Sequence, residues 1–226
     1  ERKHFYDQLK PSFFEMTAGM AFDYFADESV NFAVIETGMG GRLDSTNIIR
    51  PLLSIITNIG YDHTRFLGET LEQIAFEKAG IIKQNVPVVI GQVQSQTRPV
   101  FIENAELKNA PIYFADYLYS ADYSFMSTNN RQILNVYKGG EMHYENLHCD
   151  LIGTYQRQNI LSVLQAVDIL NKAYNISREA LYKGLAHTFE NTGIAGRWHV
   201  LGRNPAIIAD TAHNTDGMEA VIRQIE

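Results

Sequence analysis

The sequence contains a single cysteine, Cys149, among 226 residues, so no disulfide can form within the chain. A chain without disulfides fits a reducing compartment, and we therefore expect a cytoplasmic protein. No apolar run approaches the roughly 18 residues that span a bilayer, which argues against a membrane protein. The phosphate-binding pattern G-x-x-x-x-G-K-[ST] is also missing from the sequence.

Basic residues are fewer than acidic residues in this sequence. There are 19 Lys and Arg residues against 26 Asp and Glu residues, which gives a net charge of −7. This excess of negative charge argues against a general nucleic-acid binder or a binder of anionic membranes, although it leaves room for local phosphate sites. The hydrophobic content of 45% is ordinary for a globular protein, and the length allows one large or two small domains.

Short apolar runs separated by loops and helices dominate the first half of the chain. Such runs predict the parallel strands of an α/β sheet. We expect strands at residues 32–35, 52–56, 86–90 and 111–114, with a helix at 99–107.

Two capping boxes mark the starts of two further predicted helices. Ser12 with Glu15 opens a helix that runs to about Ala26, and Thr70 with Gln73 opens one that ends near Gly80. Helical spacing places Lys78 on the apolar face of the second helix. This lysine could simply reach water near the helix end, or it could lie in a restricted site where a neutral amine would be reactive.

Residues 117–150 change character, because their alternating pattern and the Asn129-Asn130 and Gly139-Gly140 turns predict a small antiparallel meander. His143, His148 and Cys149 lie in this part of the chain. They lack a second pair of ligands at a spacing typical of zinc sites, so we interpret them as ordinary strand residues.

The last third of the chain predicts two helices and then a new unit. Asn159 falls in the first turn of the first helix, where its amide could cap the helix or contact a ligand, and capping is the more common use. The small residues at 192–197 indicate a hinge or linker. We therefore expect a domain at 1–193 and the start of a second α/β domain at 194–226, with strands at 198–201 and 206–209 and a helix from Asn214.

Polar residues follow two of the predicted strands. Glu36 and a glycine-rich turn come after the strand at 32–35, and His63 lies in the loop after the strand at 52–56. Ligands of such sheets gather outside the carboxyl ends of the strands. A carboxylate and an imidazole held together at that edge can bind a divalent cation and, through it, phosphate oxygens.

Three motifs in this region carry a resemblance to a known family. They are Glu36-Thr-Gly-Met-Gly-Gly-Arg-Leu-Asp-Ser-Thr-Asn47, Thr57-Asn-Ile-Gly-Tyr-Asp-His63 and Phe76-Glu-Lys-Ala-Gly-Ile-Ile-Lys83. In this order they resemble the folylpolyglutamate synthase/dihydrofolate synthase family of the Mur-ligase superfamily. The resemblance covers essentially the whole chain, whereas the chain covers only the middle of the family's length. We therefore expect a fragment.

The resemblance implies a reaction. It points to an ATP-dependent ligase that joins L-glutamate to the carboxylate of dihydropteroate or tetrahydrofolate through an acyl phosphate, with Mg2+ neutralising the phosphates. It implies a fold with a mostly parallel α/β sheet flanked by helices, a small antiparallel meander and the start of a second α/β domain. The family places its P-loop upstream of the matched region, so we expect the fragment alone to be inactive.

The resemblance also implies individual site residues. Glu36 and His63 match magnesium ligands, Lys78 matches a lysine that is carbamylated near the metal, and His213 matches a residue of the substrate site. The residues that match ATP contacts are Asn159, Arg197 and Asp210. The residues that match the pterin pocket are Ser12, Phe13, Phe14, Glu15, Leu43, Asp44 and Ser45. One departure is Thr215, where many members carry proline.

Two alternatives to this interpretation stay open at the level of sequence. A Mur-type peptidoglycan ligase would share the chemistry without needing the pterin-pocket residues, and a non-catalytic binding module would fit the missing P-loop. We expect a monomer that binds no nucleic acid and no membrane. Whether dihydropteroate, reduced folates or both are used cannot be read from these residues.

Overall fold

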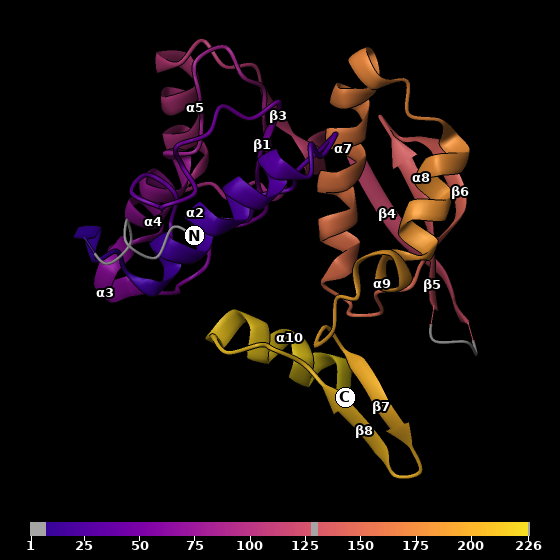
Figure 1. The fold of residues 1–226 in the computed structure, drawn as a ribbon. Coiled ribbons are helices and arrows are strands. Elements are labelled where there is room, and N and C mark those ends of the chain that lie inside the picture. The colour runs from indigo at the N-terminus through magenta and orange to yellow at the C-terminus, as the bar shows by residue number, and fades with distance from the viewer. Residues whose placement is uncertain (1–7, 128–130, 226) are drawn as a thin grey trace.

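The computed structural model describes residues 8–127 and 131–225, and its first part is built on a parallel sheet (Figure 1). The strands are β1 (Ser54–Ile56), β2 (Val88–Ile90) and β3 (Ile112–Phe114), in the order β1-β2-β3 with all pairs parallel. All three residues of β2 are buried, as expected for the central strand of a sheet covered on both faces. Three of the four predicted strands are thus confirmed.

Among the described residues, four helices from α2 to α5 accompany this sheet. They are α2 (Phe13–Asp27), α3 (Thr64–Leu67), α4 (Leu71–Ala79) and α5 (Arg98–Leu107). Both predicted capping boxes are present: Ser12 accepts a bond from the Glu15 N–H at 3.2 Å, and Thr70 caps α4 in the same way. Apolar residues of α4 and α5, including Ile74 and Phe101, form one buried cluster with β1 and β2.

The strand predicted at residues 32–35 is wrong. This segment has no regular secondary structure and belongs to none of the sheets among the described residues. Val34 is 97% exposed and Phe32 is 57% exposed, whereas a buried strand would hide such side chains. A strand needs a neighbour that accepts and donates its backbone hydrogen bonds, and in the described part of the chain β1 pairs only with β2.

The predicted meander is confirmed as a three-stranded antiparallel sheet. Its strands are β4 (Tyr119–Ser127), β5 (Arg131–Lys138) and β6 (Glu141–Cys149), in the order β4-β5-β6. Gly139 and Gly140 make the β5–β6 turn with φ of 59° and 87°, a conformation that favours glycine. The turn predicted at Asn129 and Asn130 lies outside the described residues.

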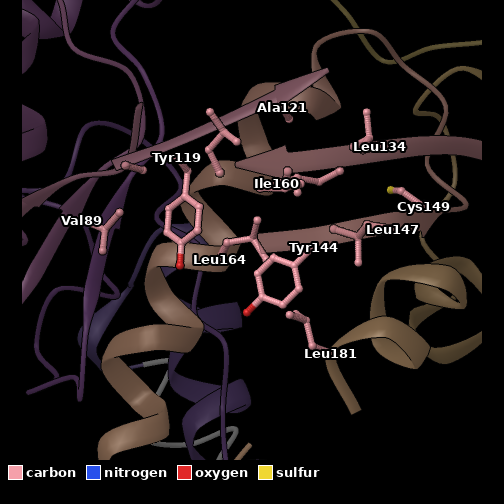
Figure 2. Packing of buried hydrophobic residues seen from close by; sticks show 13 residues of the cluster. Val89, Tyr119, Ala121, Leu134, Tyr144, Leu147, Cys149, Ile160, Leu164 and Leu181 are labelled. Carbon is pink, nitrogen blue, oxygen red and sulfur yellow. The ribbon is translucent and has the colours of Figure 1, made fainter. Parts of the chain in front are cut away.

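Helix α7 (Gln156–Tyr174) joins the two sheets. Its Ile160, Leu161 and Leu164 lie in one buried cluster with Val89 of β2 and with residues of the meander (Figure 2). Three shorter helices complete this region, namely α6 (Ala115–Leu118), α8 (Arg178–Ala186) and α9 (Thr188–Thr192). The parallel sheet and the meander therefore share part of one hydrophobic core.

The last elements are an antiparallel pair and a helix, β7 (His199–Arg203), β8 (Ala206–Ala209) and α10 (Thr215–Ile225). Figure 1 shows them standing apart from the two larger sheets, beyond α9. Gln224 of α10 ties them back, because its side chain donates to the Ile152 carbonyl at 3.1 Å and accepts from the Thr154 N–H at 2.7 Å. Among the described helices, none is long and apolar enough to cross a membrane.

Candidate functional site

The loop that follows β1 is held in place by a side chain from a distant turn. Gln94 accepts a hydrogen bond from the Ile59 N–H at 3.1 Å and donates to the Ile59 carbonyl at 2.8 Å. The loop ends at His63, which has a left-handed backbone with φ of 48° and precedes α3. Non-glycine residues with such backbones are uncommon and cluster at functional sites.

Asp62 of this loop lies close to two histidines, its neighbour His63 and the distant His213. The Asp62 carboxylate lies 3.8 Å from Nε2 of His63 and 3.6 Å from Nε2 of His213, and Asn214 donates to it at 3.2 Å. Partial burial opposes ionisation of Asp62, but the bond from Asn214 and the neighbouring histidines outweigh it and lower its pKa. Residues 152 positions apart in sequence thus meet at the end of β1.

The predicted magnesium pair is not gathered in the same way. Among the described residues the grouping of possible metal ligands consists of Asp62, His63 and His213, and Glu36 is not part of it. The Glu36 side chain is exposed, just after segment 32–35. Glu36 as a magnesium ligand stays a prediction.

Asp44 organises the glycine-rich turn. Its carboxylate accepts from the N–H groups of Gly38 and Met39, each at 2.8 Å, and from the N–H of Thr46 at 2.9 Å. Partial burial opposes ionisation, but the bonds from Thr46, Met39 and Gly38 outweigh it and lower the pKa of Asp44. Asp44 thus stabilises the turn, and a contact with a pterin stays a prediction.

The two segments predicted to line the pterin pocket meet at Gly38. A Cβ at this position would lie 2.4 Å from a Phe14 ring carbon, so the ring rests directly on the glycine. Since Gly38 is also bonded to Asp44, the start of α2 and the glycine-rich turn are in contact. Phe13 and Leu43 are each 80% exposed, which leaves apolar side chains open on this surface.

Lys78 lies half-buried in the last turn of α4, as its spacing predicts. The residue before it fixes the glycine-rich turn to this helix: Glu77 accepts from Nη2 of Arg42 at 2.9 Å and from Nε at 3.1 Å. The Glu77 carbonyl also accepts from the Arg42 N–H at 2.8 Å. Lys78 is therefore held beside the turn that follows Glu36, and its carbamylation stays a prediction.

Asp210 is surrounded by donors from two regions of the chain. It accepts from Tyr155 Oη at 2.9 Å, from the Trp198 N–H at 2.8 Å and from the Ala212 N–H at 2.9 Å. Partial burial opposes its ionisation, but these bonds and the nearby Arg197 lower its pKa. Burial and the bond to Asp210 raise the pKa of Tyr155.

Tyr155 therefore ties the last unit to the start of α7, which also carries Asn159. Arg197 lies on the other side of Asp210 and donates to the Thr211 hydroxyl. The structure thus brings Arg197 and Asp210 to the end of α7 that carries Asn159, as an ATP site made by all three would require. ATP contact by these residues stays a prediction.

Of the two uses that the sequence leaves open for Asn159, capping is not the one seen in the structure. Helix α7 begins after Tyr155 without a side-chain cap, and the Asn159 amide donates to the Gln156 side chain at 2.9 Å. Because the Asn159 side chain is bonded to Gln156, it does not cap the backbone N–H groups in the first turn of α7. Those N–H groups are left for other partners.

The meander histidines and cysteine are ordinary strand residues, as predicted. Cys149 is buried in the shared core, and burial raises its pKa to about 11. The His143 ring packs against Tyr144 with centroids 4.5 Å apart.

The structure contains two cavities that bear on the site. One of about 540 Å³ separates the segment 32–35 from β1, and none of the predicted site residues lines it. The other, of about 240 Å³, is lined by Arg197 together with residues of α9, β7 and the 150–152 segment.

Sequence reasoning missed Asp62, Tyr155 and the Arg42–Glu77 pair as parts of the site. Asp62 and Tyr155 were within reach, because Asp62 precedes the predicted His63 and Tyr155 lies four residues before the predicted Asn159. Their partners were not, since Tyr155 meets a residue 55 positions away and Asp62 one 152 positions away.

Comparison with known proteins places the chain in a family. The Mur ligase middle domain matches residues 15–167. A dihydrofolate synthase/folylpolyglutamate synthase of Bacillus subtilis is 40% identical over 218 residues, covering 93% of this chain and 48% of that protein. The chain spans about half the length of the curated relatives it matches first.

Solved structures give the same family. A folylpolyglutamate synthase of Thermotoga maritima matches with a TM-score of 0.79 at 33% identity, over 95% of this chain and 48% of that one. An FPGS–AMPPCP–folate complex matches with a TM-score of 0.88 at 27% identity, over 99% of this chain and 55% of that one. With the middle-domain match extending over most of its length, the chain belongs to the Mur ligase family.

Proposed function

We propose that the protein containing this chain is an ATP-dependent ligase that adds L-glutamate to dihydropteroate or to a reduced folate. The observation that carries the proposal is that His63 and His213 meet at Asp62 after β1, while Arg197 and Asp210 meet Tyr155 at the start of α7. The two predicted pterin segments are also in contact at Gly38. The similarity to dihydrofolate and folylpolyglutamate synthases supports it.

In this reaction the carboxylate of the pteroate or folate attacks the γ-phosphorus of ATP and releases ADP. The amine of glutamate then attacks the acyl phosphate, the new amide forms and phosphate leaves. Asn159, Arg197 and Asp210 would hold ATP, and the exposed apolar side chains of Phe13 and Leu43 would pack on the flat pterin. Closure of the unit that follows Arg197 onto α7 would complete the site.

Glu36 and His63 would hold Mg2+, and the exposed Glu36 carboxylate offers the oxygen ligand that this ion prefers. The ion would neutralise charge on the transferring phosphoryl group. Lys78 would supply a carbamate anion close by, and His213 would contact the substrate. We further propose a domain boundary at residues 193/194, a monomeric state and a cytoplasmic location.

The test is release of ADP by the full-length protein, with dihydropteroate and tetrahydrofolate compared. We expect release that requires both glutamate and one of the two pterins. No release with either pterin, or release that does not depend on glutamate, would contradict the proposal. If dihydropteroate also fails to bind, a Mur-type peptidoglycan ligase becomes the better interpretation.

A further inference from the structure

Tyr155 lies at the junction between α7 and the last unit of the chain. Its hydroxyl donates to Oδ2 of Asp210 at 2.9 Å, across 55 positions of sequence. Its backbone carbonyl accepts from the Asn159 N–H at 3.4 Å, in the first turn of α7. One residue thus contacts both Asp210 and Asn159, two of the three residues that match ATP contacts.

The Tyr155 ring is held in a defined place. A Cβ on Gly153 would lie 2.5 Å from the ring carbon Cζ, so the ring rests directly on this glycine. Partial burial and the bond to Asp210 raise the pKa of the Tyr155 hydroxyl, which therefore keeps its proton at neutral pH. The hydroxyl is then a neutral donor that reaches Asp210 from the fixed start of α7.

The two carboxylate oxygens of Asp210 are not equally occupied. Oδ2 accepts from Tyr155 and also from the Trp198 N–H at 2.8 Å. In the described part of the chain, Oδ1 accepts only from the Ala212 N–H, at 2.9 Å. Because each carboxylate oxygen has two lone pairs, Oδ1 has room for one donor from a ligand.

A purely structural tie is the alternative interpretation of the Tyr155–Asp210 bond. The last unit has another tie of that kind, since Gln224 of α10 bonds the Ile152 carbonyl and the Thr154 N–H. Both of these bonds join neutral groups, whereas Tyr155 bonds a charged carboxylate. Hydrogen bonds to charged groups are the stronger kind. The two ties therefore allow a structural role and a positioning role to be separated by experiment.

We propose that Tyr155 is a positioning residue of the nucleotide site: by holding Oδ2 it fixes the Asp210 carboxylate against the start of α7 and leaves Oδ1 for a donor group of the nucleotide. This inference rests on the proposed function, because it takes ATP as the ligand of Asp210 and Asn159. It adds a residue that acts on ATP binding through Asp210.

The test is the steady-state kinetics of Tyr155→Phe in the full-length protein, with ATP varied. This change removes the hydroxyl and keeps the ring that rests on Gly153. We expect the KM for ATP to rise by about 10-fold, with kcat and the KM for dihydropteroate within about 2-fold of the unchanged protein. An unchanged KM for ATP would overturn the inference. Equal losses in all three quantities would also overturn it, because they would indicate a general structural defect.

Two variants serve as controls. Tyr182→Phe removes a hydroxyl that donates to the Glu145 carbonyl at 2.8 Å, between α8 and β6, and should change none of these constants. Gln224→Ala removes the other tie of the last unit and should change the KM for ATP by less than about 2-fold. A rise in Gln224→Ala as large as that in Tyr155→Phe would assign both residues a structural role and overturn the positioning role.

A binding measurement separates this inference from the ligase reaction. Calorimetric titration with the ATP analogue AMPPCP, without pterin and glutamate, should give a Kd about 10-fold higher in Tyr155→Phe than in the unchanged protein. If the unchanged protein binds AMPPCP but releases no ADP, the ligase proposal fails and the titration still decides the role of Tyr155. An equal Kd in both proteins, or no binding by the unchanged protein, would overturn the inference.

Discussion

Two regions of the molecule reach order by different means. The meander and α7 bury Leu134, Val136 and Leu164 completely between hydrogen-bonded strands and a helix. The stretch of residues 31–47 has no strand in the described structure, and Val34 at its start is almost fully exposed. What fixes this stretch is a set of discrete polar contacts and close approaches, made by Asp44, Arg42 and the glycines.

The two regions show that an apolar segment forms a strand only where a neighbouring strand can pair with it. In β5 the alternating pattern finds partners on both sides, and the strand forms. At residues 32–35 an unbroken apolar run finds no partner strand in the described chain, and most of its side chains lie open. Burial, rather than composition, decides which region is sensitive to loss of apolar atoms.

The largest expected effect on stability is in the meander. Leu134→Ala should lower the free energy of unfolding by about 3 kcal/mol, because the site is fully buried and cannot collapse around the cavity. Val34→Ala is the matched change in the open stretch and should cost less than about 0.5 kcal/mol. Urea unfolding of both variants measures this. Equal losses would remove the distinction between the two regions.

A smaller effect is expected where the glycine-rich turn meets α4. A Cβ on Gly80 would lie 2.2 Å from the Arg42 Cα, so Gly80→Ala should destabilise by about 2 kcal/mol by forcing the turn away. Gly184→Ala is the control, since a Cβ there meets nothing within 4 Å and the residue lies inside α8. The control should stabilise by about 0.5 kcal/mol in the same thermal melts. If Gly80→Ala melts like the unchanged chain, the close contact with Arg42 does not hold the turn.

The smallest of these effects depends on pH. The pKa of Asp44 is lowered in the folded chain, so its contribution to stability is present above the ordinary aspartate pKa and is lost as pH falls from about 4 through the lowered value. Asp44→Asn should cost about 1–2 kcal/mol at pH 7 and progressively less below pH 4. Melting temperatures at several pH values check this, with the exposed Asp27→Asn as control. A cost that is independent of pH would mean that the charge of Asp44 does not matter.

Local features of the chain could be predicted from the sequence. The capping boxes of Ser12 and Thr70 are complete within four residues, and the Gly139-Gly140 turn needs only its own two glycines. The strand at 32–35 could not be judged locally, because pairing depends on a neighbour elsewhere in the chain.

The site shows the same limit. The motifs place His63 and His213 in loops near strand ends, but nothing in the spacing says that Asp62 meets both. The sequence leaves Asn159 free to cap its helix or to contact a ligand, and in the structure its amide donates to Gln156, one turn away. Composition and local pattern define the elements, and contacts between distant residues define the site.

The most direct test of the proposed reaction is His63→Ala in the full-length protein. The account predicts that kcat for glutamate-dependent ADP release falls by about 100-fold or more, with the Kd for dihydropteroate unchanged, because the proposed role of His63 is in the phosphate chemistry and not in pterin binding. His187→Ala should change neither quantity. Equal losses in kcat and in pterin binding would contradict the account.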